Sequence, residues 1–343
     1  MSTYRYRLRF NAPVHFGSAG IGLEKSLERL SSDSLTSALI NAFAVLGEAE
    51  EVVQALKGES PPFILSSLYP FGPSFKGSGT MFALPKPLSA PPVQDKGVLT
   101  VFAKDLKQVR YLELQDFISW IGEKPLNKEE VNSLLERSHE LARRWEPTEG
   151  RGWFAIALRP RVTLDRVYQN SSIWYCSEVH FHPYAGLYGL VRIENDAWSK
   201  RLSTAFSLLG DMGIGGERTY GMGAFNFSGL EMLDKQWSSA LIGTSNKSVL
   251  LSSYYPSPSE RSDLSSRLEA WNLSESRGYV VSGRNATTLK RKRVRMIMEG
   301  SVFRKPVRGS MVNVTPDASH DLGLEHNVYR CGLAFLWPGG GAH

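Results

Sequence analysis

Alternating polar and apolar residues mark the start of the chain as a β-strand. From Tyr4 to Phe10, tyrosine, leucine and phenylalanine occupy every second position, and arginines fill the positions between them. Because successive side chains of a strand point to opposite faces, one face of this strand would be apolar and the other basic. Pro13 follows, and we expect the strand to end before it.

Apolar residues spaced by three and four positions predict amphipathic helices. The sequence predicts such helices at 35–46, 127–145 and 198–209. Ser31 and Asp33 are suitable capping residues for the first helix, and Gly47 is placed to end it. The second helix would begin at Asn127, which together with Glu130 resembles a capping box.

Short apolar segments separated by Pro, Gly and Ser predict strands in the rest of the chain. They lie at 63–68, 81–84, 153–158, 173–181, 224–227, 248–254, 278–282, 294–298, 311–314 and 328–337. The resulting α+β pattern of strand, paired strands, helix, glycine-rich segment and strand favours a ferredoxin-like, RRM-related unit. Two such domains in tandem, with long inserted loops, would use the whole chain. Pro147 and Gly150 interrupt the pattern, so we place an N-terminal domain at 1–150 and a C-terminal domain at 151–343.

Composition narrows the class of protein. The 343 residues are 42% hydrophobic, which excludes disorder of the whole chain. Forty Lys and Arg against 34 Asp and Glu give a net charge of +6, which favours polyanionic partners such as nucleic acid. The two cysteines, Cys176 and Cys331, are too few for a disulfide framework or a four-cysteine zinc site. No apolar run is long enough to cross a membrane, and the start does not resemble a secretory signal, so we expect a cytoplasmic protein.

The segment 213–223 is the most informative motif. It holds five glycines in eleven positions, together with Arg218 and Tyr220. Glycines let backbone N–H groups approach an anion closely, an arginine can pair with phosphate, and a tyrosine ring can stack on a base. The segment follows a helix and lacks Gly-Lys-Ser/Thr, so it is neither a dinucleotide fingerprint nor a Walker A loop. A phosphate-binding loop and a plain flexible turn both remain open.

A second candidate for nucleic-acid binding begins at residue 159. Arg159, Arg161 and Arg166 are interleaved with aromatic residues, among them Tyr168 and Trp174. Single-stranded RNA is bound by this combination, because arginines pair with phosphates and aromatic rings stack on bases. The alternative is a hairpin whose arginines are only solvated.

Three arginines near the end of the chain allow two interpretations. Arg291, Arg293 and Arg295 would lie on one face of a strand, which could bind RNA or could protect a solvated edge from aggregation.

Evidence for catalysis or metal binding is weak. His180 and His182 share one side of a predicted strand with Glu178 and could bind zinc, although packed histidines are more common. His15 could act as a general base or contact RNA. The sequence lacks Gly-x-Ser-x-Gly and His-Glu-x-x-His motifs. We therefore expect no catalytic residue, no metal and no cofactor.

Several segments follow one another in a distinctive order. They are 13–17, 32–35, 159–166, 213–223, 312–316 and 329–332. Together they resemble the RAMP proteins of type III CRISPR effector complexes, and more narrowly the Csm-type (type III-A) subunit that holds the 5′ end of the guide RNA. The segment 228–311 departs from this resemblance and shows weak family character.

The resemblance implies two RRM-related folds and a non-catalytic, RNA-binding role in an antiviral ribonucleoprotein complex. Such a subunit anchors the repeat-derived 5′ handle of the CRISPR RNA (crRNA). It also inserts a hairpin thumb that displaces a base near the junction of handle and guide. It would contact the large polymerase/cyclase-like subunit on one side and a backbone RAMP subunit on the other.

Carried over by position, the resemblance and the two motifs give a set of candidate RNA-binding residues. They are His15, Arg159, Arg161, Arg166, Tyr168, Gly213, Gly215, Gly216, Arg218, Tyr220 and Gly221. The alternative function is a repeat-specific RAMP endoribonuclease that processes precursor crRNA, with His15 supported by Tyr220 or Lys76. A protein-interaction module with incidental basic charge is a third hypothesis.

Overall fold

A computed structural model describes residues 1–17, 22–74, 77–145, 151–165, 170–242, 247–281, 288–317, 324 and 326–338. Helices and strands alternate through the chain, which confirms the predicted α+β class. None of the helices in the described part of the chain has the length and apolar character that a membrane crossing needs.

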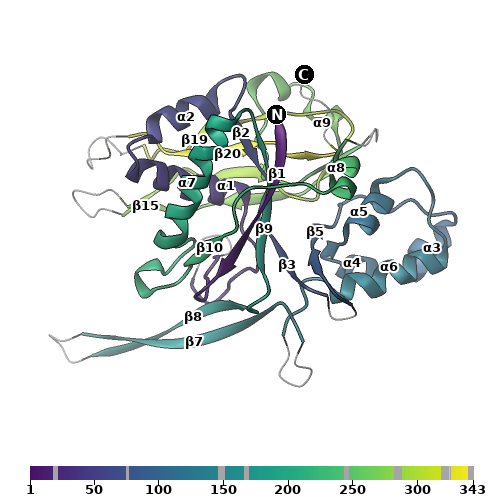
Figure 1. Cartoon of the computed structure of the whole chain (residues 1–343), viewed down its shortest axis with the longest axis horizontal. Helices are drawn as coiled ribbons and strands as arrows, with labels where there is room; N and C mark the ends of the chain where they lie inside the picture. The colour runs from purple at the N-terminus through teal and green to yellow at the C-terminus, as the bar shows by residue number, and fades with distance from the viewer. Residues whose placement is uncertain are drawn as a thin grey trace.

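One antiparallel sheet gathers strands from the start and the middle of the chain (Figure 1). Its strands are β1 (Ser2–Phe10), β2 (Phe63–Leu65), β3 (Tyr69–Pro73), β4 (Thr80–Phe82), β9 (Gly186–Ile193), β10 (Phe225–Phe227) and β11 (Glu231–Met232). The order is β10-β1-β9-β3-β4, with β11 also paired to β1 and β2 also paired to β9. The predicted first strand is confirmed, and its alternation buries Tyr6 and Leu8 completely.

Tyr6 shows how the register of β1 on β9 is fixed. It lies opposite Gly189, where a Cβ would overlap the Tyr6 hydroxyl. On its other side the ring packs against Phe206, with the ring centroids 4.7 Å apart. A shift of one residue would turn the neighbouring arginines into the core, so the sequence permits only this pairing.

The two predicted helices that pack on this sheet are confirmed. Helix α1 (Ser32–Val45) follows β1, and a separate helix, α2 (Ala49–Lys57), comes after a short turn. Helix α7 (Asp196–Met212) joins β9 to β10. Ser31 caps α1 by accepting a hydrogen bond from the Ser34 amide at 3.4 Å. Helix α7 runs past the predicted end at Gly210, because a residue without a side chain fits closely against the Phe225 carbonyl.

A helical insert follows β4 and lies at one end of the molecule (Figure 1). It contains β5 (Leu84–Pro85), α3 (Lys96–Val101), α4 (Ala103–Gln108), β6 (Tyr111–Leu112), α5 (Leu114–Ile121) and α6 (Lys128–Glu140). The predicted capping box at Asn127 and Glu130 is present. The helices at 96–121 were not predicted, since they are short and interrupted.

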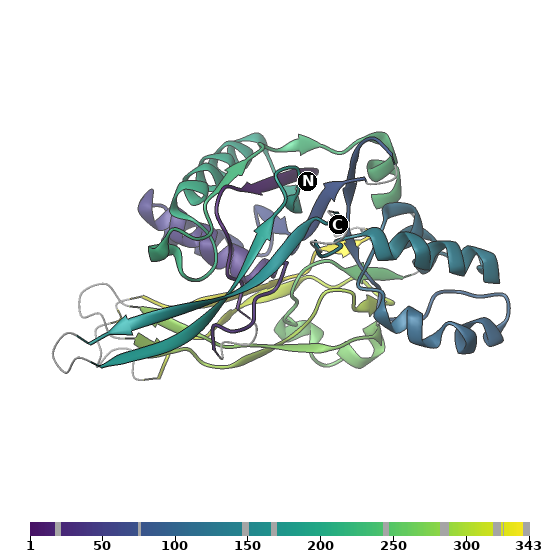
Figure 2. The same ribbon diagram turned by 90° about the horizontal axis from the view of Figure 1, so that it is seen from below.

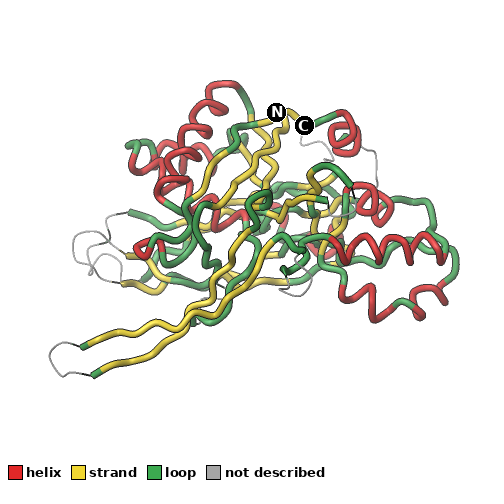
Figure 3. Tube along the Cα trace, turned by 60° about the horizontal axis from the view of Figure 1, so that its bottom comes forward, coloured by secondary structure: helices red, strands yellow, loops and turns green. Residues whose placement is uncertain are grey.

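A long two-stranded hairpin leaves the body on the side away from the insert (Figures 2 and 3). Strands β7 (Phe154–Leu164) and β8 (Ser171–Phe181) pair along their whole length, from Phe154 opposite Phe181 to Leu164 opposite Ser171. Both strands were predicted, and both are longer than expected at the tip.

The end of the chain forms a second group of strands. The elements are α8 (Lys235–Leu241), β12 (Ser248–Leu250), η2 (Pro258–Glu260), α9 (Leu264–Arg267), β13 (Leu268–Ala270), β14 (Leu273–Ser276), β15 (Tyr279–Val281), β16 (Thr288–Lys290), β17 (Val294–Ile297), β18 (Val302–Phe303), β19 (Gly309–Asn313), β20 (Tyr329–Leu333) and β21 (Leu336–Trp337). A sheet of order β13-β18-β12-β21 is accompanied by the ribbons β14–β17, β15–β16 and β19–β20. The buried Trp337 joins this group to the insert, since its ring centroid lies 5.9 Å from that of Phe117.

Strands from both sides of residue 150 share the first sheet. Strand β1 pairs with β9 through seven residue pairs and with β10 through three. The predicted division into 1–150 and 151–343 therefore does not follow the sheet, because it separates β1 from both of its neighbours.

Candidate nucleic-acid interface

The glycine-rich loop, residues 213–223, connects α7 to β10 and reaches the surface at its tip. Its two ends are buried, while Gly215 and residues 218–221 are exposed. A short 3-10 helix, η1 (Arg218–Tyr220), forms the tip and leaves the Tyr220 side chain 64% exposed. The tip is thus accessible to a ligand.

Two glycines let this loop pack closely on residues 13–16. Gly215 has φ +94°, and a Cβ there would lie 2.6 Å from the His15 carbonyl oxygen. Gly223 has φ +85°, and a Cβ there would overlap the Ile214 carbonyl. Both positions combine a left-handed backbone with no space for a side chain, so they require glycine.

Some of the predicted phosphate-binding amides are already used inside the protein. The Gly216 amide donates to the His15 carbonyl at 2.9 Å, and the Gly223 amide donates to the Pro13 carbonyl at 2.9 Å. Gly213 is buried at the base of the loop, where a Cβ would lie 2.8 Å from the Met222 carbonyl oxygen. Gly221 differs, since no atom of the described residues lies within 4 Å of its Cβ position.

His15 lies below the loop and is only 3% exposed. Its Nδ1 donates to the Ser177 carbonyl at 2.8 Å, which ties residues 13–17 to β8. The Cδ2 atom of the ring lies 3.0 Å from the Cβ position of Gly216. A ring held in this way does not reach the surface of the structure, so the predicted contact of His15 with RNA has no support from its exposure.

Arg161 joins the hairpin to the glycine-rich loop. Its guanidinium carbon lies 4.6 Å from the centroid of the Tyr220 ring and 5.6 Å from that of the Trp174 ring. Its Nη2 lies 3.3 Å from Glu178 Oε1, and its Nη1 lies 4.0 Å from Glu217 Oε2. The side chain is 18% exposed, so most of it is covered by these partners.

Glu178 is the buried acid of this cluster, with 3% of its side chain exposed. Besides Arg161, it pairs with Arg159 Nε at 3.1 Å and with His180 Nε2 at 3.3 Å. A carboxylate removed from water needs such partners to remain ionised. Arg159 nevertheless keeps 59% of its side chain exposed and remains available to a ligand.

The register gives the hairpin two different faces. Arg159 and Arg161 share one face with Trp174. The opposite face carries exposed apolar side chains, namely Leu158, Val162, Leu164, Ile173 and Tyr175. We had not predicted this apolar face, although the alternation of 158–164 contains it: every second residue there is apolar.

The remaining candidates separate into different places. Arg218 is exposed at the first position of η1, two residues before Tyr220. Arg166 and Tyr168 lie outside the described residues, as does Lys76.

The predicted row of three arginines near the end of the chain is wrong. Strand β17 begins only at Val294, and Arg291 turns inward to donate to the Arg277 carbonyl at 3.3 Å. Burial, together with the nearby charge of Arg330, lowers the pKa of Arg291 to about 10. Arg293 and Arg295 are exposed, and Arg295 lies opposite Glu275 in the β14–β17 ribbon.

The two histidines at the end of the hairpin, His180 in β8 and His182 just after it, make ordinary polar contacts. His180 pairs with Glu178, and His182 Nδ1 accepts a hydrogen bond from the Tyr184 amide at 3.2 Å. Among the residues that the structure describes, no three His, Cys, Asp or Glu side chains gather in a group that could hold a metal ion.

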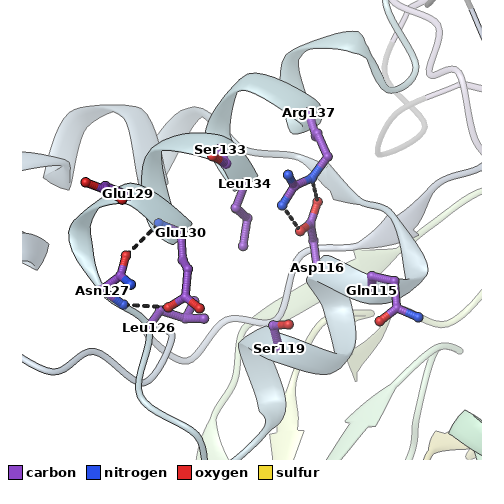
Figure 4. A pocket seen from close by; sticks show the side chains of 10 residues that line it. All are labelled: Gln115, Asp116, Ser119, Leu126, Asn127, Glu129, Glu130, Ser133, Leu134 and Arg137. Carbon is purple, nitrogen blue, oxygen red and sulfur yellow. Dashed lines mark hydrogen bonds and ion pairs between the residues drawn. The ribbon is translucent and has the colours of Figure 1, made fainter.

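A cavity of about 460 Å³ lies between α5 and α6 in the helical insert (Figure 4). Arg137 is held there by Asp116 through two hydrogen bonds of 2.6 and 3.0 Å. Asn127 and Glu130 are held by the capping box. The charged groups drawn in the figure at Asp116, Glu130 and Arg137 thus have structural partners, and the cavity is separate from the loop and the hairpin.

Comparisons with known proteins identify relatives of this chain. The family model of the CRISPR Csm4 C-terminal domain matches residues 243–338. Much of the segment 228–311 lies within this match, so the expectation of weak family character there is wrong. A curated protein of Thermococcus onnurineus (strain NA1), named CRISPR system Cms protein Csm4, is 30% identical over 317 residues, which cover 89% of each chain.

Two solved structures share the fold over nearly the whole chain. One is the Csm3-Csm4 subcomplex of a type III-A CRISPR-Cas interference complex, with a TM-score of 0.59 and 17% identity over 99% of this chain and 100% of that chain. The other is a Csm1-Csm4 cassette in complex with pppApA, with a TM-score of 0.56 and 22% identity over 98% and 97%.

The protein is a RAMP subunit of the kind found in type III CRISPR effector complexes. Within that class, the chain belongs to the Csm4 family.

Proposed function

We propose that this chain is the non-catalytic subunit that anchors the 5′ handle of crRNA and joins the large subunit to the backbone of the complex. Family membership supports this, and so do the solved structures of similar chains, which are complexes with Csm1 and with Csm3. The partners of this chain would accordingly be a Csm1-like large subunit, a Csm3-like backbone subunit and the crRNA.

The exposed tip of the glycine-rich loop is the observation that carries the RNA-binding part. It exposes Arg218 and Tyr220, and Arg161 connects Tyr220 to Trp174 of the hairpin, where Arg159 is also exposed. Guanidinium groups pair with phosphates and aromatic rings stack on bases, so this surface suits a single strand without requiring base pairs.

Other candidate residues have supporting roles in this proposal. Gly215 and Gly216 let the loop pack against His15, whose ring is buried beneath it, and Gly213 lets the base of the loop close on Met222. Gly221 permits the left-handed turn at the exposed tip.

The apolar face of the β7–β8 hairpin would act as a wedge. Aliphatic side chains inserted between bases unstack them, and the opposite face would pair with the phosphates of the same strand. This is how we propose that the hairpin displaces a base near the junction of handle and guide.

We propose that the chain folds as one ferredoxin-like unit followed by a second, smaller ferredoxin-like unit. The first would consist of β1, α1, β2 and β3, β9, α7 and β10, whose sheet order is β10-β1-β9-β3. The helical insert and the β7–β8 hairpin would be insertions between β3 and β9. We place the start of the second unit near residue 243, where the match to the C-terminal domain begins.

The geometry gives little support to a repeat-specific endoribonuclease. His15 was the expected base, but its ring is 3% exposed and its Nδ1 donates to Ser177. A catalytic base must reach the proton that it removes, within a hydrogen bond or through one water.

The test measures binding of handle-bearing RNA to the assembled complex over a range of salt concentrations. Arg218→Ala should weaken binding by about 1–3 kcal/mol, because a charge-assisted contact to phosphate is lost. The slope of log binding constant against log salt concentration should also become less steep by about 0.7. Lys124→Ala is the matched control, since Lys124 is an 85% exposed cation on the helical insert. Equal binding by the Arg218 variant and the control would contradict the loop assignment.

A further inference from the structure

We infer that Arg161 is a positioning residue that locks the β7–β8 hairpin to the glycine-rich loop, and that it is not a phosphate contact. The inference rests on the proposed function, because the surface that Arg161 assembles is the proposed RNA surface. It changes the role predicted for Arg161 from the sequence.

Contacts on both sides of the guanidinium support this role. Tyr220 belongs to the loop, with its ring centroid 4.6 Å from the Arg161 guanidinium carbon, and Trp174 belongs to the hairpin, 5.6 Å away. A planar guanidinium can stack on aromatic faces and donate hydrogen bonds in its own plane at the same time. Arg161 therefore contacts ring faces on two separate elements.

The charge of Arg161 is already neutralised. Glu178 of the hairpin and Glu217 of the loop lie 3.3 and 4.0 Å from its terminal nitrogens. A phosphate could bind Arg161 only by displacing these carboxylates, and Glu178 is too deeply buried to regain water. Arg159 also pairs with Glu178 but is 59% exposed, so it can bind a phosphate and keep its place.

The loop is shaped to meet Arg161. Glu217 adopts a left-handed backbone with φ +58°, which is costly for a residue with a side chain. The Tyr220 amide donates to the Glu217 carbonyl at 3.0 Å, and this turn places Tyr220 on Arg161. Glu217 Oε2 is buried and has no hydrogen-bond partner among the residues that the structure describes, so the Arg161 charge at 4.0 Å stabilises it.

These contacts would join the tip of the glycine-rich loop and the basic face of the hairpin into one rigid surface. The tip of the loop, with Arg218 and Tyr220, and the basic face of the hairpin, with Arg159 and Trp174, would keep a fixed spacing. A strand lying across both elements would then meet a preorganised surface, which lowers the ordering cost of binding.

The experiment compares Arg161→Ala and Arg161→Lys with Arg159→Ala in the assembled complex. Arg161→Ala should weaken handle binding by about three- to thirtyfold and leave the salt slope unchanged, because no phosphate contact is lost. Arg161→Lys should not restore binding, since an ammonium cannot stack and donate as a planar fork. Arg159→Ala should instead lower the salt slope by about 0.7.

A second measurement needs no RNA. Amide hydrogen exchange is measured on the full chain. In Arg161→Ala and in Tyr220→Leu, the exchange rate should rise both in β8 and in residues 215–221. In Arg159→Ala, the exchange rate should rise in neither region. Tyr220→Leu leaves the buried Glu178 paired with its arginines. It therefore tests the contact between the hairpin and the loop even if Arg161→Ala folds poorly.

The two measurements separate the possible failures. A reduced salt slope for Arg161→Ala with unchanged exchange in the loop would overturn the positioning role. A different failure would be a wild-type complex that shows no preference for handle RNA while the exchange rates change as expected. That result would contradict the proposed function and still support the positioning role of Arg161.

Discussion

At the scale of single residues, the sequence names candidate side chains, and the structure shows which of them are exposed and which are paired. Arg159 and Arg161 meet at Glu178, and Arg161 also lies over the Tyr220 ring, while Arg218 is exposed in the same 3-10 helix as Tyr220. Both hairpin arginines pair with Glu178, but 59% of the Arg159 side chain and 18% of the Arg161 side chain are exposed. This difference follows from long-range packing and has no local signal in the sequence. For the same reason, burial of His15 could not be predicted from its neighbours Pro13 and Gly17.

Two glycines of the loop offer a matched test of this packing. Gly221 and Gly223 have similar left-handed φ values of +80° and +85°. Gly221→Ala should cost about 1 kcal/mol in the free energy of unfolding, because only the backbone is strained. Gly223→Ala should cost about 3 kcal/mol or more, because a Cβ there also overlaps the Ile214 carbonyl.

Denaturant unfolding of the two variants measures this difference. Equal losses of stability would mean that the loop is not packed against its own base as described.

At the scale of elements, periodicity located most of the strands and helices near the site. The first strand, α1, α7 and the capping box of α6 were all predicted. The short helices of the insert were not, because α3 and α4 are too short to show a period. The apolar face of the hairpin was not predicted, because alternating aliphatic residues ordinarily indicate a strand face that is buried, whereas here they are exposed.

The pair Val162 and Ile173 tests what that face does. These residues lie opposite each other and are 55% and 63% exposed. The double variant Val162→Ser, Ile173→Thr should therefore leave the unfolding free energy within about 1 kcal/mol, since exposed positions contribute little. It should, however, reduce unstacking of the RNA at the junction of handle and guide.

A 2-aminopurine placed at that junction reports the effect, because its fluorescence rises when the base is unstacked. Wild-type complex should give a bright signal and the double variant a dimmer one. The same brightness in both would argue against the wedge.

At the scale of the whole molecule, pairing between distant segments decides the architecture. Strand β1 lies between β9 and β10, which follow it by about 180 to 220 residues. A local pattern cannot reveal such pairing, so the sequence alone could not show that a division at residues 147–150 separates paired strands. The α+β class was predictable because it depends only on which elements are present.

A fragment of residues 1–150 tests this architecture. It retains β1 and α1 but lacks β9, β10 and α7, so Tyr6 and Leu8 would lose their neighbours. We expect no cooperative thermal unfolding from the fragment, while the full chain unfolds cooperatively. A sharp unfolding transition of residues 1–150 alone would support a domain boundary at residue 150. It would contradict the proposal that β1, β9 and β10 belong to one folding unit.

Cross-linking tests the central claim most directly. Handle RNA carrying 4-thiouridine at successive positions is bound to the assembled complex, irradiated, and mapped by mass spectrometry of the attached peptides. The account predicts cross-links from handle nucleotides to residues 215–221 and to the basic face of the β7–β8 hairpin. Cross-links on this chain that fall only outside these two elements would contradict it.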